Sequence, residues 1–195
     1  MDMKYIGKLL LLVALLLFGN TVFGQWSWNA ISFNASKRLQ SLHYITEDLG
    51  YVIKATDITG TKTVEKTTNG GATWTEVTLP VVGQELQSIH FHADGAGVVV
   101  YRNLQDPIAP TKIYQTLNDG TNWQDISPDT TASGMGTAVC QFLDQDTGFF
   151  ATDSYLYATV DGGANWVKHT FTVYPMSISF LDAQHGTIGT FDGTF

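Results

Sequence analysis

The sequence of 195 residues predicts an all-β fold, a β-propeller of four-stranded antiparallel blades with three complete blades and part of a fourth. Three observations support this prediction. An eight-residue phrase recurs as TTNGGATW, TLNDGTNW and TVDGGANW at residues 67–74, 116–123 and 159–166. An aromatic residue followed six positions later by glycine occurs four times, in alternation with the phrases. Between these markers, apolar and polar residues alternate with a period of two, which is typical of half-buried strands.

The first 24 residues predict an export signal that takes no part in the fold. Two lysines precede an apolar run at residues 9–18, and Val22 and Gly24 are the small residues preferred before a signal-peptidase cut. A retained membrane anchor is the alternative, but a run of 10 residues is half of the roughly 20 needed to span a bilayer. We therefore expect residues 25–195 to form a propeller domain that is secreted, periplasmic or at the cell envelope, with no membrane insertion after cleavage.

Charge and cysteine content narrow the possible partners. The chain has 10 Lys and Arg against 18 Asp and Glu, and removal of Asp2, Lys4 and Lys8 with the signal leaves 8 against 17. Such an acidic surface repels phosphate backbones, so we expect no nucleic-acid partner.

Cys140 is the only cysteine, which excludes an intramolecular disulfide. Its place in the repeats predicts a buried core residue, with a reactive thiol as the alternative.

Each repeat predicts the same four strands in order. The first strand ends at the aromatic residue, the second begins at the glycine, the third runs into the phrase and the fourth begins at its tryptophan. The blades then cover roughly residues 41–79, 87–127, 137–172 and 176–195, with residues 26–33 as a closing strand. Because propellers usually carry four to eight blades, we expect a partial chain with an incomplete ring. A small ring of four blades that includes residues 26–33 is the alternative.

The phrase has the chemistry of a tight turn between the third and fourth strands. Its Asn or Asp can accept hydrogen bonds from backbone N–H groups of the turn, its glycine suits a positive φ, and its tryptophan can fill space between sheets. A sugar-stacking or calcium-binding loop is the alternative. The candidate structural residues are Thr67, Asn69, Gly71 and Trp74, then Thr116, Asn118, Gly120 and Trp123, and finally Thr159, Asp161, Gly163 and Trp166.

Other positions have the spacing of core residues or of metal ligands. Leu42, Ile89, Cys140 and Ile178 each lie two residues before an aromatic, so we expect them to point into the packing between blades. His90 and His92 are spaced to chelate zinc as a pair. The positions equivalent to His90 are His43, Gln141 and Ser179, a polar series without a third ligand, so we expect no metal site. Asp144 and Asp146 partly imitate a calcium loop but lack its other ligands, which favours a simple turn.

The phrase resembles the Asp-box of bacterial neuraminidase repeats, Ser/Thr-x-Asp/Asn-x-Gly-x-x-Trp, found in sialidases and other propeller families. The aromatic-to-glycine element, for example FLDQDTG at residues 142–148, is similar to repeats of the photosystem II assembly and stability factor family. The resemblance covers nearly all of residues 41–195 and implies a propeller in which the Asp-box joins the third and fourth strands. Members of the assembly-factor family bind a membrane-protein precursor and are not enzymes.

The resemblance therefore implies a non-catalytic scaffold without a cofactor, and we expect its blade loops to bind a protein or a glycan. Binding in that family is associated with an arginine-rich surface, whereas the mature sequence has only Arg38 and Arg102, so a role in photosynthesis does not follow. The alternative is a fragment of an Asp-box glycoside hydrolase, sialidase-like or xyloglucanase-like. A sialidase needs an arginine cluster, and a xyloglucanase needs two carboxylates across a cleft. No pairing can be argued among the loop carboxylates Asp57, Asp94, Asp106 and Asp153.

Overall fold

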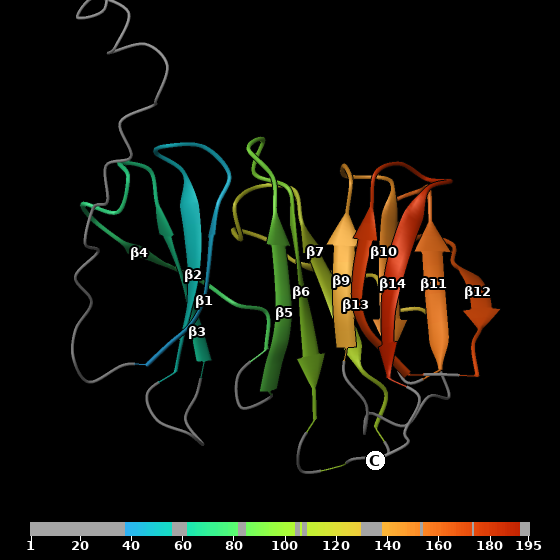
Figure 1. Cartoon of the computed structure of the whole chain (residues 1–195). Coiled ribbons are helices and arrows are strands. Elements are labelled where there is room, and N and C mark those ends of the chain that lie inside the picture. Colours follow the sequence, from blue (N-terminus) through green and yellow to red (C-terminus); the bar gives the residue numbers. More distant parts are fainter. Residues whose placement is uncertain are drawn as a thin grey trace, which may run out of the picture. The chain divides into compact units, whose positions relative to one another are not determined.

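The computed structural model describes residues 38–55, 62–81, 85–103, 106, 109–129, 138–152, 154–172 and 174–191. All of them belong to one compact unit, Phe33–Phe195. Strands are the only regular elements over these ranges (Figure 1), and no helix in them has the length and apolar character to cross a membrane. The expected signal at residues 1–24 and the expected closing strand at residues 26–33 lie outside the described residues.

The strands form three sheets of four and one sheet of two, with neighbouring strands antiparallel throughout. The spatial order within each sheet follows the chain order. Blade 1 contains β1 (Arg38–Tyr44), β2 (Gly50–Ala55), β3 (Lys62–Thr67) and β4 (Thr75–Val77). Blade 2 contains β5 (Glu85–Phe91), β6 (Gly97–Arg102), β7 (Lys112–Thr116) and β8 (Gln124–Asp125). Blade 3 contains β9 (Ala138–Phe142), β10 (Gly148–Thr152), β11 (Tyr155–Thr159) and β12 (Val167–Thr170), and blade 4 contains β13 (Tyr174–Phe180) and β14 (Gly186–Phe191). The predicted fold class, a propeller with three full blades and a partial fourth, is confirmed.

The strand ends coincide with the sequence markers because of a close contact between the aromatic residue and the glycine. In each blade the two residues are paired across the first and second strands, as Tyr44 is with Gly50 and Phe91 with Gly97. A Cβ on Gly148 would lie 2.5 Å from the ring of Phe142, and one on Gly97 would overlap the ring of Phe91. Only glycine leaves room for the ring to lie flat over the neighbouring strand.

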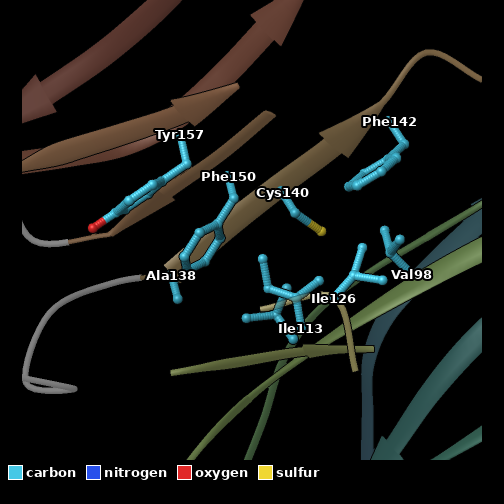
Figure 2. Packing of buried hydrophobic residues seen from close by; sticks show 9 residues of the cluster. Val98, Ile113, Ile126, Ala138, Cys140, Phe142, Phe150 and Tyr157 are labelled. Atoms are coloured by element: carbon cyan, nitrogen blue, oxygen red, sulfur yellow. The ribbon is translucent and has the colours of Figure 1, made fainter. Parts of the chain in front are cut away.

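Adjacent blades are held together by apolar clusters between their sheets. Blades 1 and 2 share a cluster in which the rings of Tyr51 and Phe91 stack with centroids 4.0 Å apart. Blades 3 and 4 repeat this contact with Phe149 and Phe180, 3.5 Å apart. Between blades 2 and 3, Figure 2 shows Cys140 and other residues of blade 3 beside the branched residues of blade 2.

The four residues predicted to point between blades behave differently from one another. Cys140 is buried in the cluster of blades 2 and 3, while Ile89 and Ile178 pack partly buried against the neighbouring clusters. Leu42 is 40% exposed, so for this residue the prediction is wrong. None of the described sheets lies before β1 in the chain, so no described sheet covers the face of blade 1 that carries Leu42.

Candidate functional site

The three phrases, residues 67–74, 116–123 and 159–166, adopt one shared conformation, which we call the Thr–Trp turn. Its centre is a buried threonine hydroxyl. In the second turn, Thr116 Oγ1 accepts hydrogen bonds from the N–H of Asn118 at 3.2 Å and of Gly120 at 2.9 Å, and Asn118 Oδ1 accepts one from the N–H of Asn122 at 2.9 Å. The same bonds occur at the corresponding atoms of the other two turns. The side chains of the turn thus satisfy its own backbone.

The glycine in the fifth position of each Thr–Trp turn has a positive φ, as the sequence predicts. The values are 89° at Gly71, 81° at Gly120 and 85° at Gly163. Two of these glycines also lie close to the preceding blade: a Cβ on Gly163 would be 2.8 Å from Ile126 Cβ, and one on Gly120 would overlap Val77. Glycine is therefore required here for both its backbone conformation and its small size.

In blades 2 and 3, the tryptophan of the turn contacts both its own blade and the preceding one. The indole Nε1 donates to a backbone oxygen of the preceding blade, from Trp123 to Thr78 and from Trp166 to Ile126, each at 2.8 Å. Within the blade, each indole meets the aromatic residue of the first strand edge-on, with ring centroids 6.3–6.5 Å apart. In blade 1, Trp74 donates to Gly71 O of its own turn at 3.1 Å.

A backbone bond fixes each Thr–Trp turn against the turn between the first two strands of its blade. The N–H of the fourth residue donates to that neighbouring turn, from Gly70 to Asp48 O at 3.0 Å, and from Gly162 to Asp146 O at 2.8 Å. Asp119 makes the equivalent bond to Gly95 O at 2.9 Å. Both kinds of turn consequently lie at the same end of each sheet, which we call the turn end.

Asp119 differs from its equivalents Gly70 and Gly162 in carrying a side chain at a positive φ of 56°. Its carboxylate reaches blade 1, where Oδ1 lies 2.5 Å from Lys66 Nζ and accepts a hydrogen bond from Tyr51 Oη at 3.1 Å. Burial, and then the nearby Asp119 charge, raises the pKa of Tyr51. Asp119 therefore provides a polar link between blades 1 and 2.

The turn end is strongly acidic. Eight exposed carboxylates lie in its turns: Glu47, Asp48, Asp94, Asp119, Asp144, Asp146, Asp161 and Asp182. Three of them have a pKa below the usual range because hydrogen-bond donors favour the ionised form. The donor that lowers the pKa most is the N–H of Thr147 for Asp144, the side-chain amide of Asn165 for Asp161, and the N–H of Gln184 for Asp182. These carboxylates thus remain charged well below neutral pH.

Three histidines lie in a row across the first strands of blades 1 and 2. The ring centroid of His90 is 6.2 Å from that of His43 and 4.9 Å from that of His92. In blade 3, the residue equivalent to His90 is Gln141, whose amide bonds both N–H and C=O of Phe180 in blade 4. Within the described ranges, no three His, Cys, Asp or Glu side chains are placed to hold a metal ion.

The described residues that were candidates for glycosidase chemistry, Arg102, Asp94 and Asp106, lie on different parts of blade 2. Arg102 pairs with Glu85 at 3.0 Å on neighbouring strands, and the side chain of Arg38 lies outside the described residues. Asp94 accepts a hydrogen bond from the N–H of Ala96 within its turn, and Asp106 is exposed in the loop between β6 and β7. Asp57 and Asp153 also lie outside the described part of the chain. Asp144 accepts hydrogen bonds from the N–H groups of Asp146 and Thr147, which is the bonding of a simple turn.

Solved structures with the same fold include two classes of protein. A structure of YCF48 bound to a D1 peptide matches with a TM-score of 0.54 and 21% identity, over 74% of this chain and 43% of that chain. YCF48 from Cyanidioschyzon merolae matches with a TM-score of 0.54 and 17% identity, over 80% and 48%. The GH74 xyloglucanase from Xanthomonas campestris matches with a TM-score of 0.58 and 15% identity, over 78% and 27%. The chain thus covers less than half the length of each of these proteins.

A family model gives the assignment at the level of sequence. No curated protein sequence matches the chain significantly. The model of the photosynthesis system II assembly factor YCF48, in contrast, matches residues 21–190, which include all three Thr–Trp turns and all but the last residue of the described strands. The chain therefore belongs to the family of the photosynthesis system II assembly factor YCF48.

Proposed function

We propose that this chain is a non-catalytic propeller scaffold that binds a segment of a protein partner through its blade loops. The observation that carries the proposal is membership of the YCF48 family, which includes a structure bound to a peptide of another protein. Apart from the inter-blade contacts, the polar side chains of the Thr–Trp turns serve their own backbone. This use of side chains supports a structural role for the turns, and we propose that they are Asp-boxes.

The charge of the turn end indicates what kind of segment would bind there. Of its eight exposed carboxylates, Asp119 pairs with Lys66. Complementary charge speeds encounter and disfavours partners of the same sign. We therefore propose a partner segment with net positive charge. The acidic turn end has the opposite charge to the arginine-rich surface associated with binding in the assembly-factor family.

We also propose that the protein is exported. The support is the sequence of the first 24 residues, in which lysines, an apolar run and small residues follow one another in the order of a signal peptide. Expression of the full chain followed by mass spectrometry of the mature N-terminus tests this proposal. A chain that begins at Gln25 in the periplasm or medium supports export, and an intact N-terminus in the cytoplasm contradicts it.

Binding to two labelled peptides of equal length, one basic and one acidic, tests the proposed partner class. The variant Glu47→Gln/Asp161→Asn removes two charges from the turn end and keeps an Asx residue in the turn, as blades 1 and 2 have. The matched control Glu76→Gln/Asp129→Asn removes two exposed charges outside the turn end. At low salt we expect the basic peptide to bind the turn-end variant about threefold to tenfold more weakly than the control, because two charges that attract it are removed. Equal binding of both peptides would contradict the charge preference.

A glycan ligand is the second candidate, favoured by one observation, the structural similarity to a GH74 xyloglucanase. Incubation of the purified chain with xyloglucan, followed by measurement of reducing ends and of binding, separates the possibilities. Release of reducing ends would replace the scaffold proposal with a hydrolase. Saturable binding without hydrolysis would identify a glycan-binding scaffold.

A further inference from the structure

The row of histidines His43, His90 and His92 has a chemistry that the binding proposal does not use. His90 lies at the centre, on β5, with His43 of blade 1 on one side and His92 of its own blade on the other. His92 Nε2 is buried and has no hydrogen-bond partner in the described part of the chain. His90 and His92 are thus partly buried, whereas His43 is exposed at the edge of the row. His90 also makes a hydrogen bond to the backbone of Phe142 in blade 3.

Few charged side chains on the neighbouring strands lie near these histidines. Opposite His90 on β6 is the apolar Val98, and Tyr101 and Arg102 of β6 pair with the far end of β5. On β9, the single titratable side chain is Cys140, whose thiol faces Ser88. Asp144, in the turn after β9, is the carboxylate on which the charge of His92 acts. A proton added at His90 thus meets two other imidazoles and no paired carboxylate.

We propose that the cluster of His43, His90 and His92 is an acid-sensitive contact, whose protonation loosens the packing of the first strands of blades 1, 2 and 3. Burial, and then the neighbouring charges of His92 and His43, lowers the pKa of His90 to about 4 from its ordinary 6.5. A group with a lowered pKa in the folded state contributes stability that is complete above about pH 6.5. That stability is lost as the pH falls towards 4, because the unfolded chain takes up the proton first.

Gln141 of blade 3 indicates which substitution of His90 to test, because it occupies the equivalent position. Its amide occupies the position of His90 and holds the next blade without titrating. His90→Gln should therefore retain a polar contact while it removes the pH dependence. His169→Gln is the control, because His169 is exposed on β12 and away from the cluster.

The test is urea unfolding of the full chain and both variants at pH 7.5, 6.5, 5.5 and 4.5, with EDTA present. We expect the unfolding equilibrium constant of the wild type and of His169→Gln to rise more steeply on acidification than that of His90→Gln. One site accounts for at most about tenfold per pH unit between pH 6.5 and 4. Tryptophan emission should shift to the red before the strand signal in circular dichroism is lost, because Trp123 and Trp166 bond across blades. Identical pH dependence in all three proteins would overturn the proposal.

A second measurement covers the case in which His90→Gln does not fold. In the wild type, proton NMR of the imidazole C–H groups follows each histidine separately through the same pH range. Titration of His90 with a midpoint below about pH 5 supports the proposal, and a midpoint near 6.5 overturns it.

Discussion

The indole Nε1 of Trp123 donates a hydrogen bond to the carbonyl oxygen of Thr78 at 2.8 Å, and the two residues belong to neighbouring blades. Trp166 repeats this bond to Ile126 one blade later, at the same distance. The Thr–Trp turn thus has two tasks. Its threonine and its Asn or Asp close the turn within one blade. In blades 2 and 3, its tryptophan and glycine also hold that blade against the one before it.

The buried threonine hydroxyl predicts a clear loss of stability when it is removed. In Thr116→Val, the N–H groups of Asn118 and Gly120 lose their acceptor, and an unsatisfied buried N–H costs roughly 1–3 kcal/mol. We expect a loss of that size in urea unfolding. Thr121→Val, an exposed position in the same turn, is the control and should change stability by less than about 0.5 kcal/mol. Equal effects of the two substitutions would contradict the central role of the hydroxyl.

The pairing of aromatic and glycine predicts a coupled effect of two substitutions. Gly97→Ala places a Cβ against the ring of Phe91 and should cost about 1–3 kcal/mol through overpacking. Phe91→Leu removes the ring and leaves space beside the same glycine. We expect the double variant to lose less stability than the two single losses combined, by about 0.5 kcal/mol or more in a double-mutant cycle. Strict additivity would show that the ring does not explain the glycine.

The unusual backbone of Asp119 predicts an order of stabilities. Asp119→Ala loses the contacts with Lys66 and Tyr51 and keeps a side chain at positive φ, which costs roughly 1–2 kcal/mol in the left-handed region. Asp119→Gly loses the same contacts but relieves the backbone, as in the equivalent residues Gly70 and Gly162. In thermal unfolding, the midpoint temperature of Asp119→Ala should therefore be lower than that of Asp119→Gly. The reverse order would mean that the backbone carries no strain.

Burial predicts that the single thiol is unreactive in the folded protein. Desolvation raises the pKa of Cys140 to about 12, and its thiol faces Ser88 between blades 2 and 3. At pH 8 a disulfide reagent such as dithionitrobenzoate should react with no thiol in the native chain and with one thiol per chain in denaturant. Rapid reaction of the native protein would show that this part of the core is open.

The sequence predicts the strands well because the markers have local physical causes. The aromatic and glycine are paired across one hairpin, and the Thr–Trp turn is closed by its own side chains, so both give signals over a few residues. The contacts between blades were harder to predict. That Asp119 would reach Lys66 and Tyr51, or that Trp123 would bond Thr78, depends on how two sheets sit together, and nothing in the eight-residue phrase specifies the partner.

The row of His43, His90 and His92 is a second example of a contact between blades that the sequence did not predict. The spacing of His90 and His92 shows that they share a strand face, but the approach of His43 from blade 1 follows from packing between sheets. The position equivalent to His90 is Gln141 in blade 3, which bonds the next blade through an amide. A polar residue before the aromatic was visible in the sequence, and its use between blades was not.

The most direct test of the propeller arrangement is a nuclear Overhauser spectrum of the full chain that follows the indole N–H protons of Trp123 and Trp166. The account predicts contacts from Trp123 to Thr78 and Val77, and from Trp166 to Ile126, because each indole bonds the blade before its own. Indole protons that show contacts only within their own turns, and exchange with water as free indoles do, would contradict blades joined in this way.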